Sequence, residues 1–191
     1  MSHTDDVISQ AREVLLQNYK QQPIVLTRGE GSYVWDAEGR RYLDLIAGIA
    51  TCALGHCNPT VVAAAKKQLD TLWHASNVFY TEPQIQLAAR LTKASGLPGA
   101  RAFFCNSGAE ANEALIKLAR RYQHEVKGNK ERSDLITFEG GFHGRTLATV
   151  TATAQPKYQA GFEPLPQGFR YAQLGDLEGV KKLVGPTTAG I

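Results

Sequence analysis

The chain has 191 residues, of which 43% are hydrophobic and 20% are charged, and its formal net charge is +3. This composition is typical of one globular domain or of part of a larger one, and it excludes an intrinsically disordered chain. No stretch approaches the roughly 18 apolar residues of a membrane span, and the acidic start MSHTDDVIS differs from a signal peptide. With three cysteines at no disulfide spacing, these features predict a cytoplasmic protein without a membrane partner.

The first fifty residues are expected to form one helix and then short antiparallel strands. Residues 5–19 place apolar side chains at helical spacing behind two acidic residues, which suit a helix N-terminus. Residues 24–46 change to a strand pattern around a turn at 36–39, where Gly39 is free to take a positive φ. This piece is predicted to be a separate small subdomain.

From about residue 51 the pattern changes to alternating helices and strands. Asn58 is a candidate helix cap with Pro59 in the first turn, and the apolar stripe from Val62 to Trp73 is expected to be buried. The later predicted elements are a helix over 83–96 with a buried stripe, strands at 101–105, 134–138 and from 186, a helix after residue 106 and a short helix over 176–184. Such alternation predicts an α/β fold with a mostly parallel sheet.

Small residues stand between the strand expected at 101–105 and the helix after it. Ser107 and Glu110 have the spacing of a capping box, and Gly108 lets another group approach the backbone closely. Amides at a helix N-terminus attract phosphate, and open α/β sheets bind ligands at the carboxyl ends of their strands. The alternative is a helix that is only well capped. The pattern is neither Walker A nor GxGxxG, so it gives no support to nucleotide hydrolysis.

A second loop, 139-EGGFHGRT-146, follows the strand expected at 134–138. Taken alone, Phe142 is more typical of a core residue than of a ligand contact. Arg145 is harder to assign to packing, because a guanidinium in a glycine-rich loop can pair with a carboxylate through two parallel hydrogen bonds. A phosphate cradle, a flat aromatic side chain and a carboxylate clamp together suggest a planar phosphorylated cofactor and an amino-acid substrate. Pyridoxal phosphate meets that description.

These motifs occur within longer stretches that resemble the class III aminotransferases, and most closely the acetylornithine group of that family. The stretches are 31-GSYVWDAEGRRYLDLIAGIATCALGHCNP-59, 72-LWHASNVFYTEP-83, 106-NSGAEANEALIKLAR-120, 138-FEGGFHGRTLATVTAT-153 and 155-QPKYQAGFEPL-165. The resemblance is to the N-terminal half of the family and implies part of the pyridoxal-phosphate transferase fold type I. It assigns residues 1–50 to the N-terminal segment of the small domain, and 51–191 to an incomplete large cofactor-binding domain.

The resemblance also implies roles for individual residues. Ser107, Gly108 and Ala109 would hold the cofactor phosphate, although the family often has Thr at the position of Ala109. A backbone amide contact survives that change, whereas a hydroxyl contact would not. Phe142 would stack on the pyridine ring, and Arg145 would bind the substrate α-carboxylate.

The implied activity is transfer of the terminal amino group of N2-acetylornithine to 2-oxoglutarate, in arginine biosynthesis, by a cytoplasmic homodimer. Ile49 stands where the ornithine δ-aminotransferases resemble each other in carrying an aromatic residue, which favours an N-acylated donor. Succinylornithine, ornithine and 4-aminobutyrate remain alternative donors.

The family's chemistry needs a lysine that forms a Schiff base with the cofactor. In the family that lysine lies beyond the position that corresponds to residue 191, so the resemblance implies that this chain is a fragment that would be inactive alone. The loop 139–146, which contains Arg145, is called the arginine loop below. Lys157 is the one lysine in an irregular segment after this loop, and it is a poor candidate for a functional amine. The alternative is a non-catalytic truncated chain that binds a phosphate ligand or pairs with full-length subunits.

Two further patterns point to no separate function. Cys52, His56 and Cys57 lack a second ligand pair at structural-zinc distance, so no metal site is expected. A cluster of basic residues near the end of the helix that follows residue 106 suits the helix dipole and is typical of a solvated face, with an acidic partner as the alternative. No nucleic-acid-binding motif accompanies it.

Overall fold

The computed structural model describes residues 2–191 and forms two compact units, with the division between Glu82 and Pro83. The first unit contains α1 (His3–Val14), β1 (Leu26–Glu30), β2 (Tyr33–Asp36), β3 (Arg41–Leu43), α2 (Ala47–Ala50) and α3 (Pro59–Leu69). The second contains α4 (Glu82–Ser95, which begins at the division), α5 (Gly108–Arg121), η1 (Tyr122–Val126), β4 (Asp134–Phe138), α6 (Leu147–Ala152), α7 (Pro156–Gln159), β5 (Phe169–Ala172), α8 (Leu177–Leu183) and β6 (Thr188–Gly190). The division of the complete fold at residue 50 stays a prediction.

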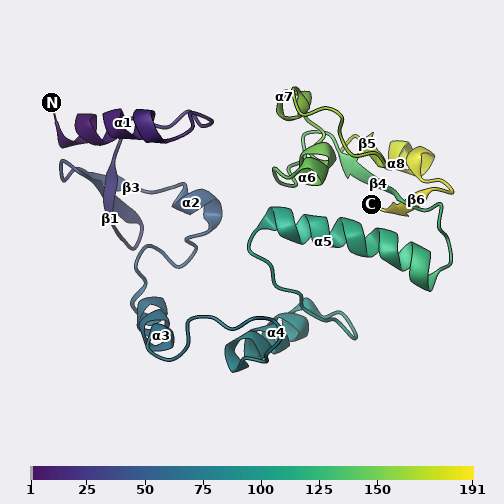
Figure 1. Cartoon of the computed structure of the whole chain (residues 1–191), viewed down its shortest axis with the longest axis horizontal. Coiled ribbons are helices and arrows are strands. Elements are labelled where there is room, and N and C mark those ends of the chain that lie inside the picture. The colour runs from purple at the N-terminus through teal and green to yellow at the C-terminus, as the bar shows by residue number, and fades with distance from the viewer. Residues whose placement is uncertain (1) are drawn as a thin grey trace. The chain divides into compact units, whose positions relative to one another are not determined.

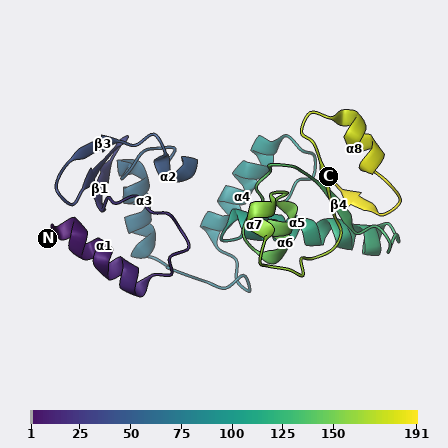
Figure 2. The same cartoon turned by 90° about the horizontal axis from the view of Figure 1, so that it is seen from above.

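The first unit has an antiparallel sheet with the strand order β1-β2-β3, and α1 lies alongside it (Figures 1 and 2). The turn between β2 and β3 confirms the prediction, because Gly39 has a φ of 79°. The buried carboxylate of Asp36 accepts hydrogen bonds from the Arg40 amide at 2.8 Å and from the Tyr42 hydroxyl at 2.6 Å. The Tyr42 hydrogen bond is the main cause that lowers the pKa of Asp36. This carboxylate therefore organises the turn.

After β3 the backbone makes a left-handed turn, α2, in which Ala47, Gly48, Ile49 and Ala50 have φ values of 47°, 62°, 58° and 63°. Three of these residues are not glycine, so the turn is strained. The Asp44 carboxylate accepts a hydrogen bond from the Ala47 amide at 2.9 Å, at the start of the turn.

His56 holds Asp44 in place, because its Nε2 lies 2.7 Å from Asp44 Oδ2. The hydrogen bond with His56 is also the main cause that lowers the pKa of Asp44. The backbone of His56 is fixed in turn by two hydrogen bonds with Gly31, of 2.8 and 3.0 Å. His56 therefore contributes to a polar clamp on the strained turn.

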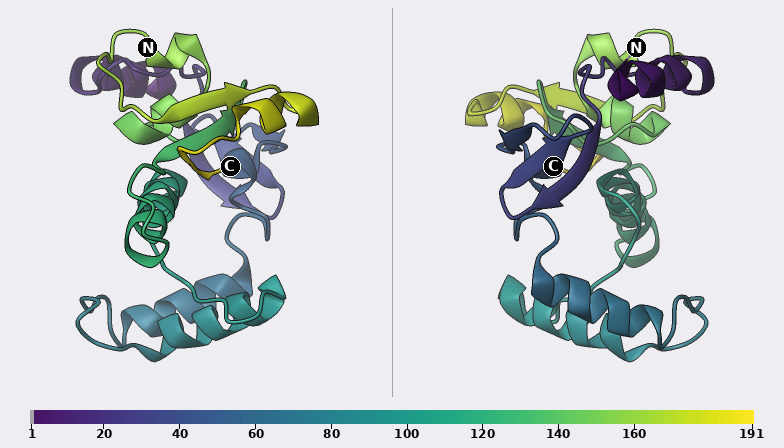
Figure 3. Two further views of the ribbon diagram at one scale, coloured as in Figure 1. Left: turned by 90° about the vertical axis from the view of Figure 1, so that its right-hand side faces the viewer. Right: turned by 90° about the vertical axis from the view of Figure 1, so that its left-hand side faces the viewer.

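The second unit contains a parallel sheet with the strand order β5-β4-β6, which confirms the predicted α/β class. The central strand β4 supplies the buried side chains of Leu135 and Ile136. Helix α5 lies along one face of the sheet and buries Ile116 (Figures 1 and 3). The carboxyl end of β4 leads directly into the loop that contains Phe142 and Arg145.

Several predicted helix ends are confirmed. Asn58 caps α3 by accepting hydrogen bonds from the amides of Thr60 and Val61, at 3.1 and 3.3 Å, with Pro59 in the first turn. Helix α8 and strand β6 lie where the sequence predicts a short helix and a strand. Within residues 2–191 there is no helix long and apolar enough to span a membrane.

Three expectations are wrong. The first helix ends at Val14, five residues before its expected end at residue 19. Residues 101–105 form no strand, because no strand within residues 2–191 pairs with them, and Phe103 is 73% exposed. The apolar stripes of α3 and α4 are not buried, since both helices lack a buried residue and Trp73 is 80% exposed. Both segments are helical, as their spacing predicts. Burial depends on a partner surface, and within the described residues no other element packs extensively on these stripes.

Candidate active site

The N-terminus of α5 presents backbone amides that point out of the helix. Ser107 caps it as predicted, since its hydroxyl accepts a hydrogen bond from the Glu110 amide at 3.1 Å. Within residues 2–191, the amides of Gly108 and Ala109 have no acceptor, as expected for the first turn of a helix. A Cβ added to Gly108 would meet nothing within 4 Å, so the space beside Gly108 is open.

The predicted capping box forms only in part. The Glu110 carboxylate accepts hydrogen bonds from the backbone amide and the side-chain amide of Asn106, and not from Ser107. Two donors on one residue make Asn106 the better partner for this carboxylate. The Glu110 carboxylate therefore already has hydrogen-bond partners within the loop.

The loop after β4 ends in a second capped helix. Thr146 caps α6 by accepting a hydrogen bond from the Thr149 amide at 3.4 Å, and the Thr149 hydroxyl accepts one from the Thr146 amide at 3.0 Å. The Thr153 hydroxyl, at the end of α6, accepts a hydrogen bond from the His143 amide at 2.8 Å. Both Thr149 and Thr153 are fully buried. The backbone on either side of Arg145 is thus fixed by buried threonines.

The structure brings the two predicted loops together. A Cβ added to Gly144, whose φ is +130°, would lie 2.6 Å from the Cβ of Ala109, so only glycine permits this close approach. The Asn112 side-chain amide donates a hydrogen bond to the His143 carbonyl oxygen at 2.7 Å. The Thr146 hydroxyl donates one to the Glu113 carboxylate. The first turns of α5 and the arginine loop therefore form one continuous site.

Within this site Arg145 stacks on two aromatic rings. Its guanidinium carbon lies 5.5 Å from the centre of the Phe142 ring and 4.4 Å from that of Tyr158. Phe142 is not a core residue, because it is 62% exposed. All the site residues predicted from the sequence thus lie on these two adjoining loops, and Tyr158 joins them from α7.

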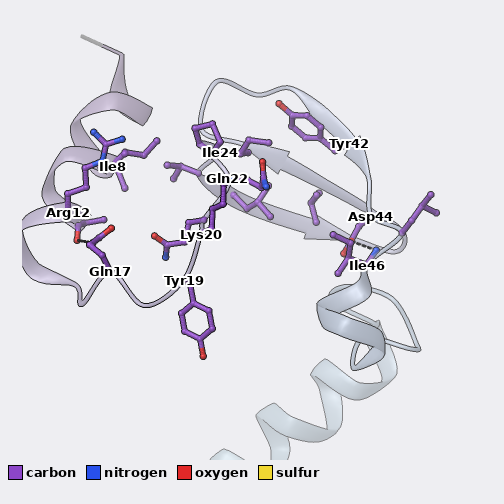
Figure 4. A pocket seen from close by; sticks show the side chains of 18 of the residues that line it. Ile8, Arg12, Gln17, Tyr19, Lys20, Gln22, Ile24, Tyr42, Asp44 and Ile46 are labelled. Atoms are coloured by element: carbon purple, nitrogen blue, oxygen red, sulfur yellow. Dashed lines mark hydrogen bonds between the residues drawn. The ribbon is translucent and has the colours of Figure 1, made fainter. Parts of the chain in front are cut away.

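The first unit has a separate open hollow of about 920 Å³ between α1 and the antiparallel sheet. Figure 4 shows its lining, which includes Ile8, Tyr19, Ile24 and Ile46. No predicted site residue lines this hollow. Within residues 2–191 no group of three or more His, Cys, Asp or Glu side chains suited to a metal ion occurs, at Cys52, His56 and Cys57 or elsewhere.

The sequence model of the aminotransferase class-III family matches residues 15–184. The chain belongs to the class-III aminotransferases. It is 66% identical over 190 residues to the acetylornithine aminotransferase of Myxococcus xanthus, which covers 100% of this chain and 47% of that protein. It is 50% identical over 192 residues to the acetylornithine aminotransferase of Xylella fastidiosa, with coverage of 100% and 46%. The chain spans about half the length of the curated relatives it matches.

Solved structures of aminotransferases have the same fold. An ornithine aminotransferase from Toxoplasma gondii, described with pyridoxal phosphate at its active site, has a TM-score of 0.91 at 28% identity and covers 97% of this chain and 44% of that chain. An omega-transaminase from Thermomicrobium roseum has a TM-score of 0.88 at 30% identity, with coverage of 99% and 49%. Class-III aminotransferases are pyridoxal-phosphate enzymes, which agrees with the predicted cofactor class.

The geometry of this aminotransferase chain fits a phosphate group. Two amides without acceptors and open space at Gly108 suit an anion at the start of α5. No role in the site is predicted from the sequence for Asn112, Glu113 or Tyr158. Asn112 and Glu113 lie three and four positions after Ala109, on the same helix face, so helical spacing could have found them. No local signal connects Tyr158 with Arg145.

Proposed function

We propose that this chain provides the cofactor-phosphate site and the substrate-carboxylate site of an aminotransferase. The proposed reaction moves the terminal amino group of N2-acetylornithine to 2-oxoglutarate, as part of arginine biosynthesis in the cytoplasm. The observation that carries the proposal is the close contact of Gly144 with Ala109, in a chain of the class-III family. The choice of donor is supported by the names of the Myxococcus and Xylella relatives.

In this proposal the cofactor is pyridoxal 5′-phosphate. Ser107, Gly108 and Ala109 hold its phosphate through two backbone amides and a hydroxyl, at the positive end of the α5 dipole. Phe142 would stack on the pyridine ring. Pyridoxal phosphate supplies the electron sink that amino-group transfer requires.

Arg145 is the proposed anchor for the α-carboxylate of the amino donor and for a carboxylate of 2-oxoglutarate. Its side chain is exposed, and within residues 2–191 no carboxylate pairs with it. A planar guanidinium offers two parallel donors, which match the two oxygens of a carboxylate. This pairing orients the substrate so that its amino group faces the cofactor.

We further infer that no lysine within residues 2–191 forms the Schiff base, so the chain alone is inactive. Lys157 is next to Tyr158 in the sequence, but its Nζ lies over the Tyr158 ring, 4.7 Å from the ring centre, and its side chain is exposed. The complete enzyme is expected to be a homodimer. The competing hypothesis is a non-catalytic chain that binds a phosphate ligand or pairs with full-length subunits.

Cofactor binding is tested by adding pyridoxal phosphate to the 191-residue chain and to two matched variants. Gly108→Asp places a carboxylate where the phosphate is expected, whereas Gly185→Asp adds the same group at another glycine with open surroundings. Visible absorption should report binding to the wild type and to Gly185→Asp, and borohydride reduction should leave no lysine with a stoichiometric adduct. A single lysine fully modified by reduction would contradict the inference about the Schiff base.

The substrate role is tested in an active enzyme that contains this chain. Arg145→Ala should raise KM for acetylornithine roughly 10- to 100-fold, because a hydrogen-bonded ion pair is lost. The affinity for pyridoxal phosphate should change much less. Equal losses in both would show that Arg145 does not act as a carboxylate anchor. If no protein that contains this chain has transaminase activity with any of these donors, the non-catalytic hypothesis is favoured.

A further inference from the structure

Arg145 differs from the other stacked arginines of the described chain because its guanidinium lies over two aromatic rings instead of one. Within residues 2–191 it is the one guanidinium placed over two aromatic side chains, those of Phe142 and Tyr158. Arg28, over Trp35, also forms an ion pair with Glu30.

Arg120 provides a second contrast. Its guanidinium lies over Phe169 and also donates hydrogen bonds to the carbonyl oxygens of Ser133 and Gln167, both at 2.9 Å. Arg145 has no hydrogen-bond or ion-pair partner among the residues that the structure describes. Its stacking contacts are therefore what hold its head group.

Stacking leaves the hydrogen-bonding edge of a guanidinium available. A ring beneath the guanidinium attracts the positive charge through its electron-rich face and limits the orientations of the side chain. The N–H donors point outward in the plane of the group and are not used by the ring. An arginine held in this way loses less conformational freedom when it pairs with a carboxylate.

Tyr158 belongs to a short helix, α7, that is tied to the site at both ends. At one end, the Gln155 side-chain amide donates hydrogen bonds to the carbonyl oxygens of Gly140 and Gly141, at 3.2 and 2.8 Å. These two glycines precede Phe142 in the arginine loop. The start of α7 is thus fixed directly to the loop that contains Arg145.

At the other end of α7, the Gln159 side-chain amide donates to the carbonyl oxygens of Thr151 and Thr153, at 3.1 and 3.0 Å. These carbonyl groups lie at the end of α6, where that of Thr153 also accepts a hydrogen bond from the Gln155 backbone amide at 2.7 Å. Tyr158 is half-buried between these two anchors. Its ring therefore has a defined position under Arg145.

We propose that Tyr158 is a positioning residue for the substrate carboxylate. Its ring orients the Arg145 guanidinium so that two donors face the α-carboxylate, and this sharpens the preference for donors that carry one. The inference rests on the proposed function of Arg145 as the carboxylate anchor. Lys157, whose Nζ also lies over the Tyr158 ring, adds positive charge beside the anchor.

The test compares two amino donors in an active enzyme that contains this chain. One is N2-acetylornithine, and the other is N-acetyl-1,4-diaminobutane, which has the same carbon chain without the α-carboxylate. Tyr158→Ala should raise KM for acetylornithine roughly tenfold, with kcat changed less than about twofold. The KM for the donor without a carboxylate should stay unchanged.

Three further variants separate stacking from packing. Tyr158→Phe keeps the aromatic face and should behave like the wild type, whereas Tyr158→Leu keeps much of the apolar bulk and should behave like Tyr158→Ala. Tyr122→Ala is the matched control. Tyr122 also lies under a cation, since the Lys127 Nζ is 5.5 Å from the centre of its ring, but it does not belong to the arginine loop. This control should leave both KM values unchanged.

Equal changes for the two donors, or a Tyr158→Leu variant with the wild-type preference, would overturn the proposal. Arg145→Ala distinguishes this failure from failure of the proposed function. If Arg145→Ala removes the preference for the carboxylated donor but the Tyr158 variants keep it, only the positioning role is wrong. If Arg145→Ala keeps the preference, the carboxylate anchor itself is wrong.

Discussion

Two regions of the chain are held by different kinds of interaction. The first is residues 134–153, which contain β4, the arginine loop and α6, and the second is the helices α3 and α4. In the first region Ile136, Thr149 and Thr153 are fully buried, and the two threonines have hydrogen-bond partners. In the second region no residue is buried, although α3 has a well-formed cap. The comparison teaches that local signals are sufficient to define a helix, whereas a functional site requires contacts between segments distant in sequence.

The solvent-accessible surface of the chain is also larger than compact packing would leave. The described chain has a solvent-accessible surface of 15140 Å². Even two separate compact domains of this total mass would expose only about 11,000 Å². Exposed apolar side chains such as Leu69, Leu72 and Trp73 contribute to the difference. Apolar burial within residues 2–191 is thus concentrated in the second unit, around β4 and α6.

The largest expected effect comes from shortening one apolar side chain in each region. Ile136→Ala should lower the free energy of unfolding by about 2–5 kcal/mol, because it leaves a cavity beneath the sheet. Leu69→Ala in α3 removes a side chain that is 49% exposed, and it should cost less than about 1 kcal/mol. Chemical denaturation of the 191-residue chain measures both. Equal losses would mean that the stripe of α3 is buried in solution.

A smaller but still large effect is expected at the junction of the two loops. Gly144→Ala forces a Cβ into Ala109 at a backbone conformation that only glycine adopts readily, so it should cost about 3 kcal/mol. Gly185→Ala is the control, since a Cβ there meets nothing within 4 Å and no positive φ is needed. Thermal unfolding and cofactor binding should both be impaired in Gly144→Ala alone. If Gly144→Ala bound the cofactor like the wild type, the close contact between Gly144 and Ala109 would not be needed for cofactor binding.

Removing one hydroxyl should distinguish the polar interior of the site from the exposed turn that follows α3. Thr153→Val leaves the His143 amide without its acceptor, which should cost about 1–3 kcal/mol. Thr71→Val removes an exposed hydroxyl that donates to the Lys67 carbonyl oxygen, and it should be nearly neutral. The difference in midpoint on urea denaturation measures the contrast. A neutral Thr153→Val would show that water replaces the lost partner.

The smallest expected effect is a dependence on pH in the first unit. Hydrogen bonding to His56 lowers the pKa of Asp44 below its ordinary value, so the native state favours the carboxylate. The associated stability is present above the ordinary aspartate pKa and is lost as pH falls through the lowered value. Asp44→Asn should therefore be less stable than the wild type near neutral pH, and the difference should shrink in acid. Denaturation at a series of pH values measures this. A difference that is constant with pH would contradict the role of the Asp44 charge.

Much of the fold and of the site could be predicted from the sequence, because the informative residues act on their neighbours. Asn58 and Ser107 cap helices through amides two or three positions away, and Gly39 permits its own turn. The loop around Arg145 was identified because glycines and functional groups are close together in the chain. These local signals also support the resemblance to the class-III family.

The remainder depends on distant partners that no local pattern specifies. The stretch 101–105 has the composition of a strand, but pairing decides whether it forms one. The stripes of α3 and α4 have the spacing of a buried face, but burial needs a surface to pack on. Tyr158 reaches Arg145 only because Gln155 and Gln159 tie α7 to the loop and to α6. Neither glutamine has a sequence signature for that role.

The central claim is that the start of α5 is a phosphate site that adjoins the arginine loop. It is tested most directly by following the backbone amide resonances of the ¹⁵N-labelled chain as pyridoxine 5′-phosphate is added, with pyridoxine as the control. This ligand has no aldehyde, so it cannot react with lysines. The account predicts that the amides of Gly108 and Ala109 shift with the phosphorylated compound and not with pyridoxine. Unchanged Gly108 and Ala109 resonances, or equal shifts with both compounds, would contradict it.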